Sequence, residues 1–511
     1  MELELKKIAL DTYQTLGDLM LTQEETTETI VPDYCPDIAR IVKTDSKVFL
    51  HHREIRDGKA EISGIIRLNV LYIPDGEHGV RALEFAIPFS VESDHRMLNE
   101  CQLITCDAEP EFLETRMLNP RKLFTRCKLI LRITGYRKGP LEFSTDVETN
   151  EEQCIQKRCE QQSVMFLTQI AEKDFTFSGE MNVSPGKSGA SEILENQVSW
   201  MVTESKIVGN KLIFKGMLFV SLLYRSTDGE CCSATAELPF SQIMEIDAIS
   251  ENAEVSLCLH LSGTDIQIDG GDPEGRQFSI MLYFHGTALL REKQELTLLN
   301  DLYSTAYEVN FDAAPVVLTE YREIMNRRQM VREVLEIGAS AEHMLAATVK
   351  CGSVAISREE SATVLRTMAE IKVLYLGEGG APLVAERSVN IVSQMDIPAD
   401  CIVKAHAVCA EEVQGSLGDR GIEVRFPVDF HIETEKQVKK VCVNRAKLDM
   451  DSAKDFSGTP SLILKYIGKH ESGWELAKKY NTTIADILAA NQLEEEPLPT
   501  EKLLLIPRKR A

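Results

Sequence analysis

An internal repeat constrains the fold of this 511-residue chain more than any other feature of its sequence. The segment Arg67–Tyr72 recurs as Phe219–Tyr224 and again as Glu370–Tyr375, so that the three tyrosines stand 152 and 151 residues apart. The first two copies share further markers at this spacing: Gly64 with Gly216, Pro88-Phe89 with Pro239-Phe240, and Gly135 with Gly286. The third copy has Thr367 in place of the first glycine and lacks the Pro-Phe pair. A period of about 150 residues is the length of a domain, so we expect three tandem domains and a C-terminal tail.

The repeated segments alternate apolar and polar residues, as half-buried strands do. Leu68, Val70 and Tyr72 alternate with Arg67 and Asn69. Turn sequences follow the repeated segments, such as Pro74-Asp75-Gly76 in the first copy and Thr227-Asp228-Gly229 in the second, and they indicate hairpins. The sequence therefore predicts a mainly β fold, with three tandem β-sandwich-like repeats.

The boundaries follow from the repeat and from changes in composition. We assign residues 1–160, 161–310 and 311–443 to the three repeats, 444–460 to a polar linker and 461–508 to a small C-terminal domain. The segments Leu5–Leu19 and Tyr321–Leu335 have mixed apolar spacing, and we expect them to be helices that join or edge the repeats.

The charge of the chain excludes some classes of partner. Eighty acidic and 56 basic side chains give a net charge of −24. Such a chain repels phosphates, so we expect neither nucleic-acid binding nor attachment to an anionic membrane. The segment from Ser461 onward has eight Lys/Arg and seven Asp/Glu, so nearly all of the negative charge lies in the repeats. We find no apolar run that predicts a signal peptide or a membrane span, and we expect a cytosolic protein without direct membrane insertion.

The sequence contains no motif that predicts catalysis or a bound cofactor. The thirteen cysteines include no C-x-x-C pair, so we expect small core residues in a reducing compartment instead of disulfides or a zinc site. Gly186-Lys187-Ser188 resembles the end of a phosphate-binding loop, but Met181 stands where that motif requires its first glycine. We therefore expect no cofactor, no metal, no catalytic residue and no enzymatic activity. A hydrolase whose carboxylates pair only in the folded chain remains the alternative.

The tail has the pattern of a small β-α-α-β domain. Leu462–Ile467 reads as a strand, and Ser472 with Glu475 forms a capping-box pattern that predicts a helix start. Asn481 suits the end of that helix. Thr483 predicts the cap of a second helix, and Leu503–Ile506 reads as a closing strand.

This tail resembles a LysM domain. The match lies in Ile467, Trp474, Leu476–Asn481, Ile487–Asn491 and Leu504–Pro507. LysM domains bind ligands in a groove, and the resemblance implies partner-binding residues at Ile467, Lys469, His470, Glu471, Ser472, Trp474, Asn491 and Leu493. His470-Glu471-Ser472 stands where the family usually carries Gly-Asp-Thr, which argues against carbohydrate. Trp474 has two interpretations: it covers the core of the domain, or it is an aromatic hot spot at the rim of the groove.

The repeats resemble the SPOCS domains of clostridial and bacillar sporulation proteins. Their N-terminal signature is similar to Val31–Ile41, and a degenerate echo opens the second copy at Val183-Ser184-Pro185. SPOCS repeats followed by one LysM domain are typical of spore-coat morphogenetic proteins. The resemblance implies a non-enzymatic adaptor in the mother-cell cytoplasm, at the forespore outer surface or spore coat. It also implies docking of the LysM-like domain onto the ATP-hydrolysing scaffold protein of the coat, with other coat proteins as possible further partners. A protein that binds peptidoglycan or cortex glycan is the alternative.

Overall fold

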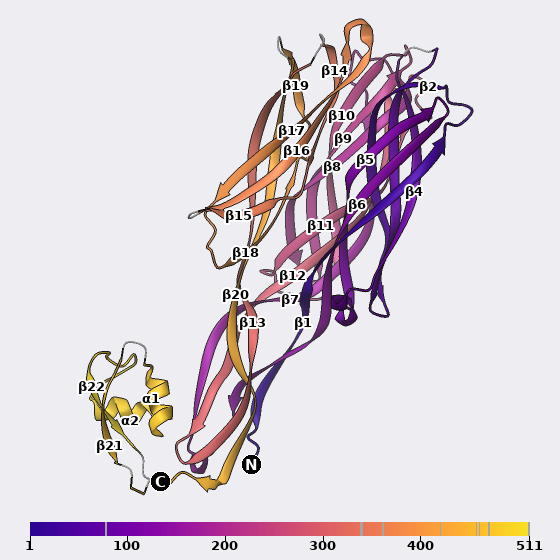
Figure 1. Ribbon diagram of the computed structural model, residues 1–511. Coiled ribbons are helices and arrows are strands. Elements are labelled where there is room, and N and C mark those ends of the chain that lie inside the picture. Colours follow the sequence, from indigo (N-terminus) through magenta and orange to yellow (C-terminus); the bar gives the residue numbers. More distant parts are fainter. Residues whose placement is uncertain are drawn as a thin grey trace.

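The computed structural model describes residues 1–76, 79–337, 341–359, 362–418, 421–455, 457–458, 460–468 and 471–508. The protein is mainly β, as predicted, and its few helices are short. Figure 1 shows the strands gathered into a broad body, a narrower stalk that continues from it, and a small module beside the end of the stalk. In the described part of the chain, no helix has the length and apolar character that crossing a bilayer requires.

The first repeat contains two three-stranded antiparallel sheets, ordered β1-β6-β5 and β2-β3-β4. The short helix η1 lies between β4 and β5, and η2 follows β6. The bounds are β1 Leu5–Ile30, β2 Ile38–Arg56, β3 Lys59–Pro74, β4 Arg81–Ser93, η1 Arg96–Glu100, β5 Leu103–Asn119, β6 Lys122–Val147 and η2 Glu151–Gln153.

The second and third repeats use the same plan. The second has sheets β7-β12-β11 and β8-β9-β10. In the third, β13-β20-β18 forms one sheet with β19 also on β20, while β14 and β15 share one edge of β16 and β17 takes the other. The bounds are β7 Ile155–Asn182, β8 Ala190–Val208, β9 Lys211–Ser226, β10 Cys231–Glu245, β11 Glu254–Ile268, β12 Gln277–Ser304, β13 Tyr307–Leu335, β14 Ala341–Cys351, β15 Ala355–Glu359, β16 Ala362–Gly377, η3 Glu378–Gly380, β17 Pro382–Met395, β18 Cys401–Val408, β19 Gln414–Gly418 and β20 Gly421–Ala453.

Each repeat is a sandwich whose core lies between its two sheets. In the first repeat, Ile66 and Leu68 of β3 and Leu129 and Leu131 of β6 belong to one buried cluster. Their neighbours along β3 are more exposed, which is the alternation that the sequence showed.

The structure explains the glycine and Pro-Phe markers of the repeat. Gly64 lies opposite Phe89 across β3 and β4, and a Cβ on Gly64 would lie 2.9 Å from the Phe89 ring. In the second repeat Gly216 faces Phe240 in the same way, at 2.5 Å. The third repeat has Thr367 opposite Ile391. A Cβ at Gly64 or Gly216 would also lie 2.3 Å from a backbone carbonyl oxygen, that of Phe49 or Met201, so the phenylalanine ring and the neighbouring strand together exclude a side chain at these positions.

The two segments that we expected to be helices are strands. Leu5–Leu19 lies in β1, which pairs with β6 over its whole length, and Tyr321–Leu335 lies in β13, which pairs with β20. Register shifts occur between Thr15 and Gly17 and between Thr319 and Tyr321. The bulge within the first segment adds a residue and reverses which face the following side chains occupy. This interruption of the two-residue period accounts for part of the mixed apolar spacing.

The long strand pairs β1/β6, β7/β12 and β13/β20 continue beyond the sandwiches, and their far ends form the stalk, where all three repeats share one core (Figure 1). Phe143, Phe166, Leu298, Leu318 and Cys442 meet in one buried cluster there. The predicted linker 444–460 begins too early, because β20 continues to Ala453 and its buried residues pack in the stalk.

The repeats also meet around a common axis within the body. Leu71, Leu223 and Leu374 occupy corresponding positions in the three copies, and they belong to one cluster with Leu194 and Leu345. One chain thus builds a body that resembles a trimer of sandwiches.

The C-terminal module (residues 461–508) has the predicted order β-α-α-β. Its elements are β21 Leu462–Tyr466, α1 Gly473–Tyr480, α2 Ile484–Ala490 and β22 Leu503–Pro507. The Ser472 hydroxyl accepts the Glu475 N–H at 3.2 Å, and Asn481 ends α1 with a φ of 51°. Thr483 caps α2 by accepting the Asp486 N–H at 3.0 Å. Local capping chemistry therefore determines where both helices begin.

Candidate partner-binding site

The module contacts the end of β12 in the stalk through two aromatic side chains. The rings of Trp474 and Tyr303 meet edge to face with centroids 5.0 Å apart, and the Tyr303 hydroxyl donates to the Thr482 carbonyl at 2.7 Å. Tyr303 is buried together with the core residues of the module. Burial raises the pKa of Tyr303, so this hydroxyl keeps its proton and remains a donor. The repeats thus contribute a side chain to the core of the module.

Polar contacts surround this aromatic pair. Asp301 accepts the indole N–H of Trp474 at 2.8 Å and the Lys478 ammonium at 2.6 Å. Lys454, just beyond β20, donates to the Ser304 carbonyl at 3.0 Å and to the Asn481 side chain at 2.7 Å. A charged acceptor strengthens both bonds to Asp301. The module is therefore attached to the stalk by specific contacts.

The predicted groove residues that precede α1 have roles inside the module. Ile467 is fully buried in its core. The Glu471 carboxylate accepts the Gly468 N–H at 2.8 Å and lies 3.1 Å from the Lys465 ammonium, and these two contacts lower its pKa. Ser472 caps α1. Lys469 and His470 lie outside the described residues.

The remaining predicted groove residues follow the helices or contact the stalk. Asn491 bridges α2 to β22, because its amide donates to the Ile487 and Leu505 carbonyls and its oxygen accepts the Leu505 N–H at 2.7 Å. Leu493 is partly buried against the module core. Trp474 is only 8% exposed. Binding of a separate partner by the predicted residues stays a prediction.

Sequence reasoning missed the stalk side of this contact. Asp301 and Tyr303 lie in β12 of the second repeat, and Asp301 is 173 residues from Trp474 in the sequence. The sequence carries no signal that would pair these positions, because the contact forms only when the stalk places the end of β12 beside α1.

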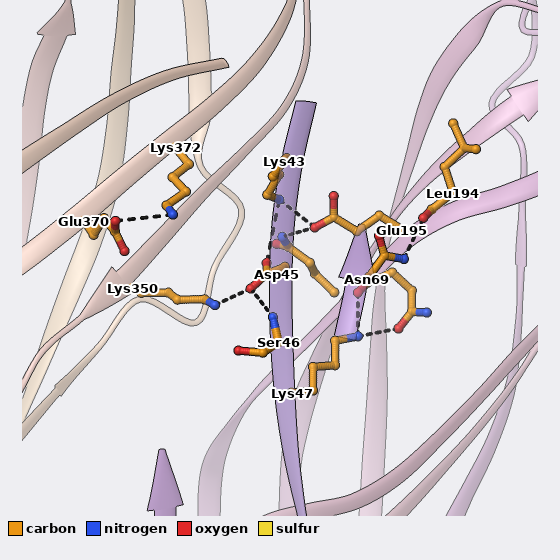
Figure 2. A network of polar contacts seen from close by, with 12 residues as sticks. Lys43, Asp45, Ser46, Lys47, Asn69, Leu194, Glu195, Lys350, Glu370 and Lys372 are labelled. Carbon is orange, nitrogen blue, oxygen red and sulfur yellow. Dashed lines mark hydrogen bonds and ion pairs between the residues drawn. The ribbon is translucent and has the colours of Figure 1, made fainter. Parts of the chain in front are cut away.

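A second cluster of charged residues lies where the three repeats meet. Figure 2 shows that Lys43 and Asp45 of β2 lie between Glu195 of β8 and Lys350 of β14. The Lys43 ammonium lies 2.7 Å from Glu195 and 3.7 Å from Asp45, and Lys350 also pairs with Asp45. Lys47 donates to the backbone and side-chain oxygens of Asn196, both at 2.5 Å. The cluster joins all three repeats through side chains of opposite charge.

Burial and pairing oppose one another in this cluster. Burial favours the neutral form of Lys43, but Glu195 and Asp45 outweigh it and raise the pKa of Lys43. Burial also acts on Asp45, yet Lys350 and Lys43 lower its pKa to about 2. Around Lys47 the nearby carboxylates do not outweigh the effect of burial, which lowers the pKa of Lys47 to about 8. The ion pairs of Lys43 and Asp45 connect the repeats, which is a structural role.

A hollow of about 530 Å³ opens between the first two repeats beside this cluster, lined by Arg67, Glu84, Phe85, Ala86, Gly263, Thr264, Asp265 and Tyr283. Arg67 donates to the Thr264 carbonyl at 3.0 Å and thereby joins the two repeats within the hollow.

Within the described residues, no group of three or more His, Cys, Asp or Glu side chains is arranged to hold a metal ion. All thirteen cysteines are free thiols, and burial raises the pKa of several of them, including Cys106, Cys231 and Cys258 to about 12. Such thiols remain protonated and are poor nucleophiles.

Comparison with known families connects this architecture to one domain type. The family model of the SipL SPOCS domain matches residues 37–118 and 189–269. These segments span β2 to β5 of the first repeat and β8 to β11 of the second. These two segments are therefore similar to SPOCS domains, as the sequence resemblance predicted, while the third repeat and the C-terminal module lie outside the matched segments. No curated protein and no solved structure gave a significant match to the chain.

Proposed function

We propose that this SPOCS-domain chain is a non-enzymatic adaptor that helps to assemble the spore coat on the forespore surface. In this proposal the repeats form the rigid body of the adaptor. The LysM-like C-terminal module docks onto the ATP-hydrolysing scaffold protein of the coat. The protein acts in the mother-cell cytoplasm, at the outer surface of the forespore.

The observation that carries the proposal is the match of two repeats to the SipL SPOCS domain, because it ties the chain to sporulation. The distribution of charge supports a separate binding module. The repeats carry nearly all of the net charge of −24, whereas the module is close to neutral. Like-charged surfaces repel one another at close range, so the module is the part of the chain that meets an acidic protein with least repulsion.

The position of the module also supports this division of roles. It lies beside the far end of the stalk, away from the sandwiches (Figure 1). Its contact with Asp301 and Tyr303 holds it in one orientation. A preorganised binding domain loses less entropy when its partner binds.

The test is a binding assay between the purified full chain and the coat scaffold ATPase of the same organism. Removal of residues 461–511 should abolish binding. Trp474→Glu should weaken binding at least tenfold, because Trp474 is buried in the module core and against the stalk. Asp301→Ala is the matched control, because it removes the stalk contact of Trp474 and leaves the module sequence intact. Binding that persists without residues 461–511 would contradict docking through the module.

The glycan alternative predicts a different result with the same protein. Full-length chain that co-sediments with purified peptidoglycan, and loses this property with the deletion of 461–511, would favour a cortex or cell-wall function. The adaptor proposal predicts that the chain stays in the supernatant.

A further inference from the structure

The C-terminal module exposes an apolar face on the side of its sheet opposite to the helices. Leu462, Leu464 and Tyr466 of β21 are 51%, 62% and 55% exposed, and Leu503 of β22, which lies opposite Tyr466, is 59% exposed. The other face of β21 carries Ile463, which packs against the module core. Figure 1 shows α1 on the side of the module that faces the stalk, with β21 and β22 on the far side.

One edge of this small sheet is closed. The Asn491 side chain accepts the Leu505 N–H at 2.7 Å and donates to the Leu505 carbonyl at 2.6 Å. It thereby occupies the outer edge of β22 at the centre of the strand. No second strand can add there without displacing Asn491.

The other edge, along β21, is open. Because Leu505 bonds to Asn491, its opposite residue Leu464 cannot exchange backbone bonds with β22, and its N–H and C=O point outward. Bonds from Arg508 to Ser461 and from Ile467 to Lys502 show that the alternate residues of this strand are the ones that face β22. Leu462, Leu464 and Tyr466 therefore direct their backbone groups to the outside, and in the described part of the chain no backbone bond reaches them.

We propose that β21 of this module pairs with β21 of a second copy of the chain. The two strands run antiparallel about a twofold axis through Leu464. Leu464 then faces its counterpart and Leu462 faces Tyr466, so that the exposed side chains pack across the new strand pair. On the other face, Ile463 lies opposite Lys465, which places no like charges directly opposite one another. The product is a four-stranded sheet across the two modules.

Three observations favour a second copy over other occupants. A strand that pairs with itself needs a self-complementary sequence, and β21 has one about Leu464. In the described part of the module, Asn491 closes the edge of β22 and leaves that of β21 open, so pairing through this sheet ends at a dimer and does not propagate into a fibre. The module is near neutral and lies at the end of the stalk, where two acidic bodies can remain apart.

The size of the apolar face argues for edge pairing over face-to-face stacking. A stable interface buries about 800 Å² on each partner, which four exposed side chains on a pair of five-residue strands do not supply. Backbone hydrogen bonds along β21 add the missing interactions. The inference goes beyond the proposed function, and the adaptor role stands whether or not the chain forms this dimer.

The test is sedimentation-velocity ultracentrifugation of the full chain over micromolar concentrations, with two variants at one position. Leu464→Pro removes the outward N–H, at a position where proline leaves the bonds between β21 and β22 intact. Leu464→Ala keeps the N–H and removes most of the side chain. We expect wild type to shift from monomer to dimer with concentration, Leu464→Ala to need a several-fold higher concentration, and Leu464→Pro to stay monomeric.

Hydrogen exchange on the wild type supplies a second measurement that does not depend on how the proline variant folds. On dimerisation the amides of Leu462, Leu464 and Tyr466 should gain protection, while those of Ile463 and Lys465 should change little. A wild-type chain that stays monomeric throughout, or a dimer without added protection at these three amides, overturns the inference. A folded Leu464→Pro variant that dimerises as wild type does overturns it as well.

Discussion

The ion pair between Lys43 and Glu195 gives the sharpest prediction about how the repeats hold together. Its charged atoms lie 2.7 Å apart, and the two side chains are only 5% and 7% exposed. The residues come from β2 of the first repeat and β8 of the second. Replacing Glu195 with Ala leaves the Lys43 ammonium buried, with Asp45 at 3.7 Å as its remaining charged partner.

The structure sets the size of the effect. Removing one partner of a buried ion pair costs about 3–5 kcal/mol, because the other charge remains desolvated. Asp45 compensates part of this cost, so we expect Glu195→Ala to lower the free energy of unfolding by about 3 kcal/mol. Replacing the pair by Lys43→Met with Glu195→Leu removes both charges and keeps the volume. We expect that double variant to lie within about 1 kcal/mol of wild type.

The assay is urea unfolding of the full chain, followed by the fluorescence of Trp200 in β8 with Trp474 replaced by Phe. Trp200 packs edge to face on Phe284 within the second repeat, so it reports on the body. A loss below about 1 kcal/mol for Glu195→Ala would refute the reasoning. A double variant as unstable as the single one would refute it too.

Three further predictions concern the module contact, acid stability and the repeat markers. In a Trp200→Phe background, Asp301→Ala should shift the emission of Trp474 to longer wavelength as the indole reaches water; an unchanged spectrum would contradict the contact. The rings of His406 and His431 stack, and burial lowers the pKa of both; the charge of His406 lowers the pKa of His431 further. Their neutral forms therefore contribute stability above about pH 6.5, and this contribution falls as the pH drops below that value. Melting temperatures between pH 7 and 5 should decline less when both are replaced by Gln, and an equal decline would count against this explanation. Gly216→Ala should destabilise the second repeat by about 1–3 kcal/mol in urea, because its Cβ would lie 2.3 Å from the Met201 carbonyl oxygen and 2.5 Å from the Phe240 ring. Adding Phe240→Ile should recover only the part of the loss that is due to the ring; a Gly216→Ala variant as stable as wild type would contradict this explanation.

Local patterns in the sequence predicted the parts of the fold that depend on local chemistry. Alternation around Tyr72 and its two counterparts predicted strands, and their equal spacing predicted three repeats. Ser472 and Thr483 predicted where the two helices of the module begin, because a capping hydroxyl bonds within three residues of its own position.

Features that depend on distant residues were missed. Leu5–Leu19 was expected to be helical because a bulge interrupts its alternation, and only pairing with β6 makes it a strand. The linker was placed too early because residues 444–453 are polar, although the stalk makes them part of β20. Trp474 could be interpreted as a core residue or a binding residue, and its contact with Asp301 depends on how the stalk and the module are placed.

The proposed function requires that the body and its C-terminal module act together at the surface of the developing spore. A fluorescent fusion followed during sporulation tests it most directly, as full-length chain and without residues 461–511. The account predicts a ring around the forespore for the full chain and diffuse mother-cell fluorescence for the truncated one. Diffuse fluorescence of both proteins, or an unchanged ring without the module, would contradict it.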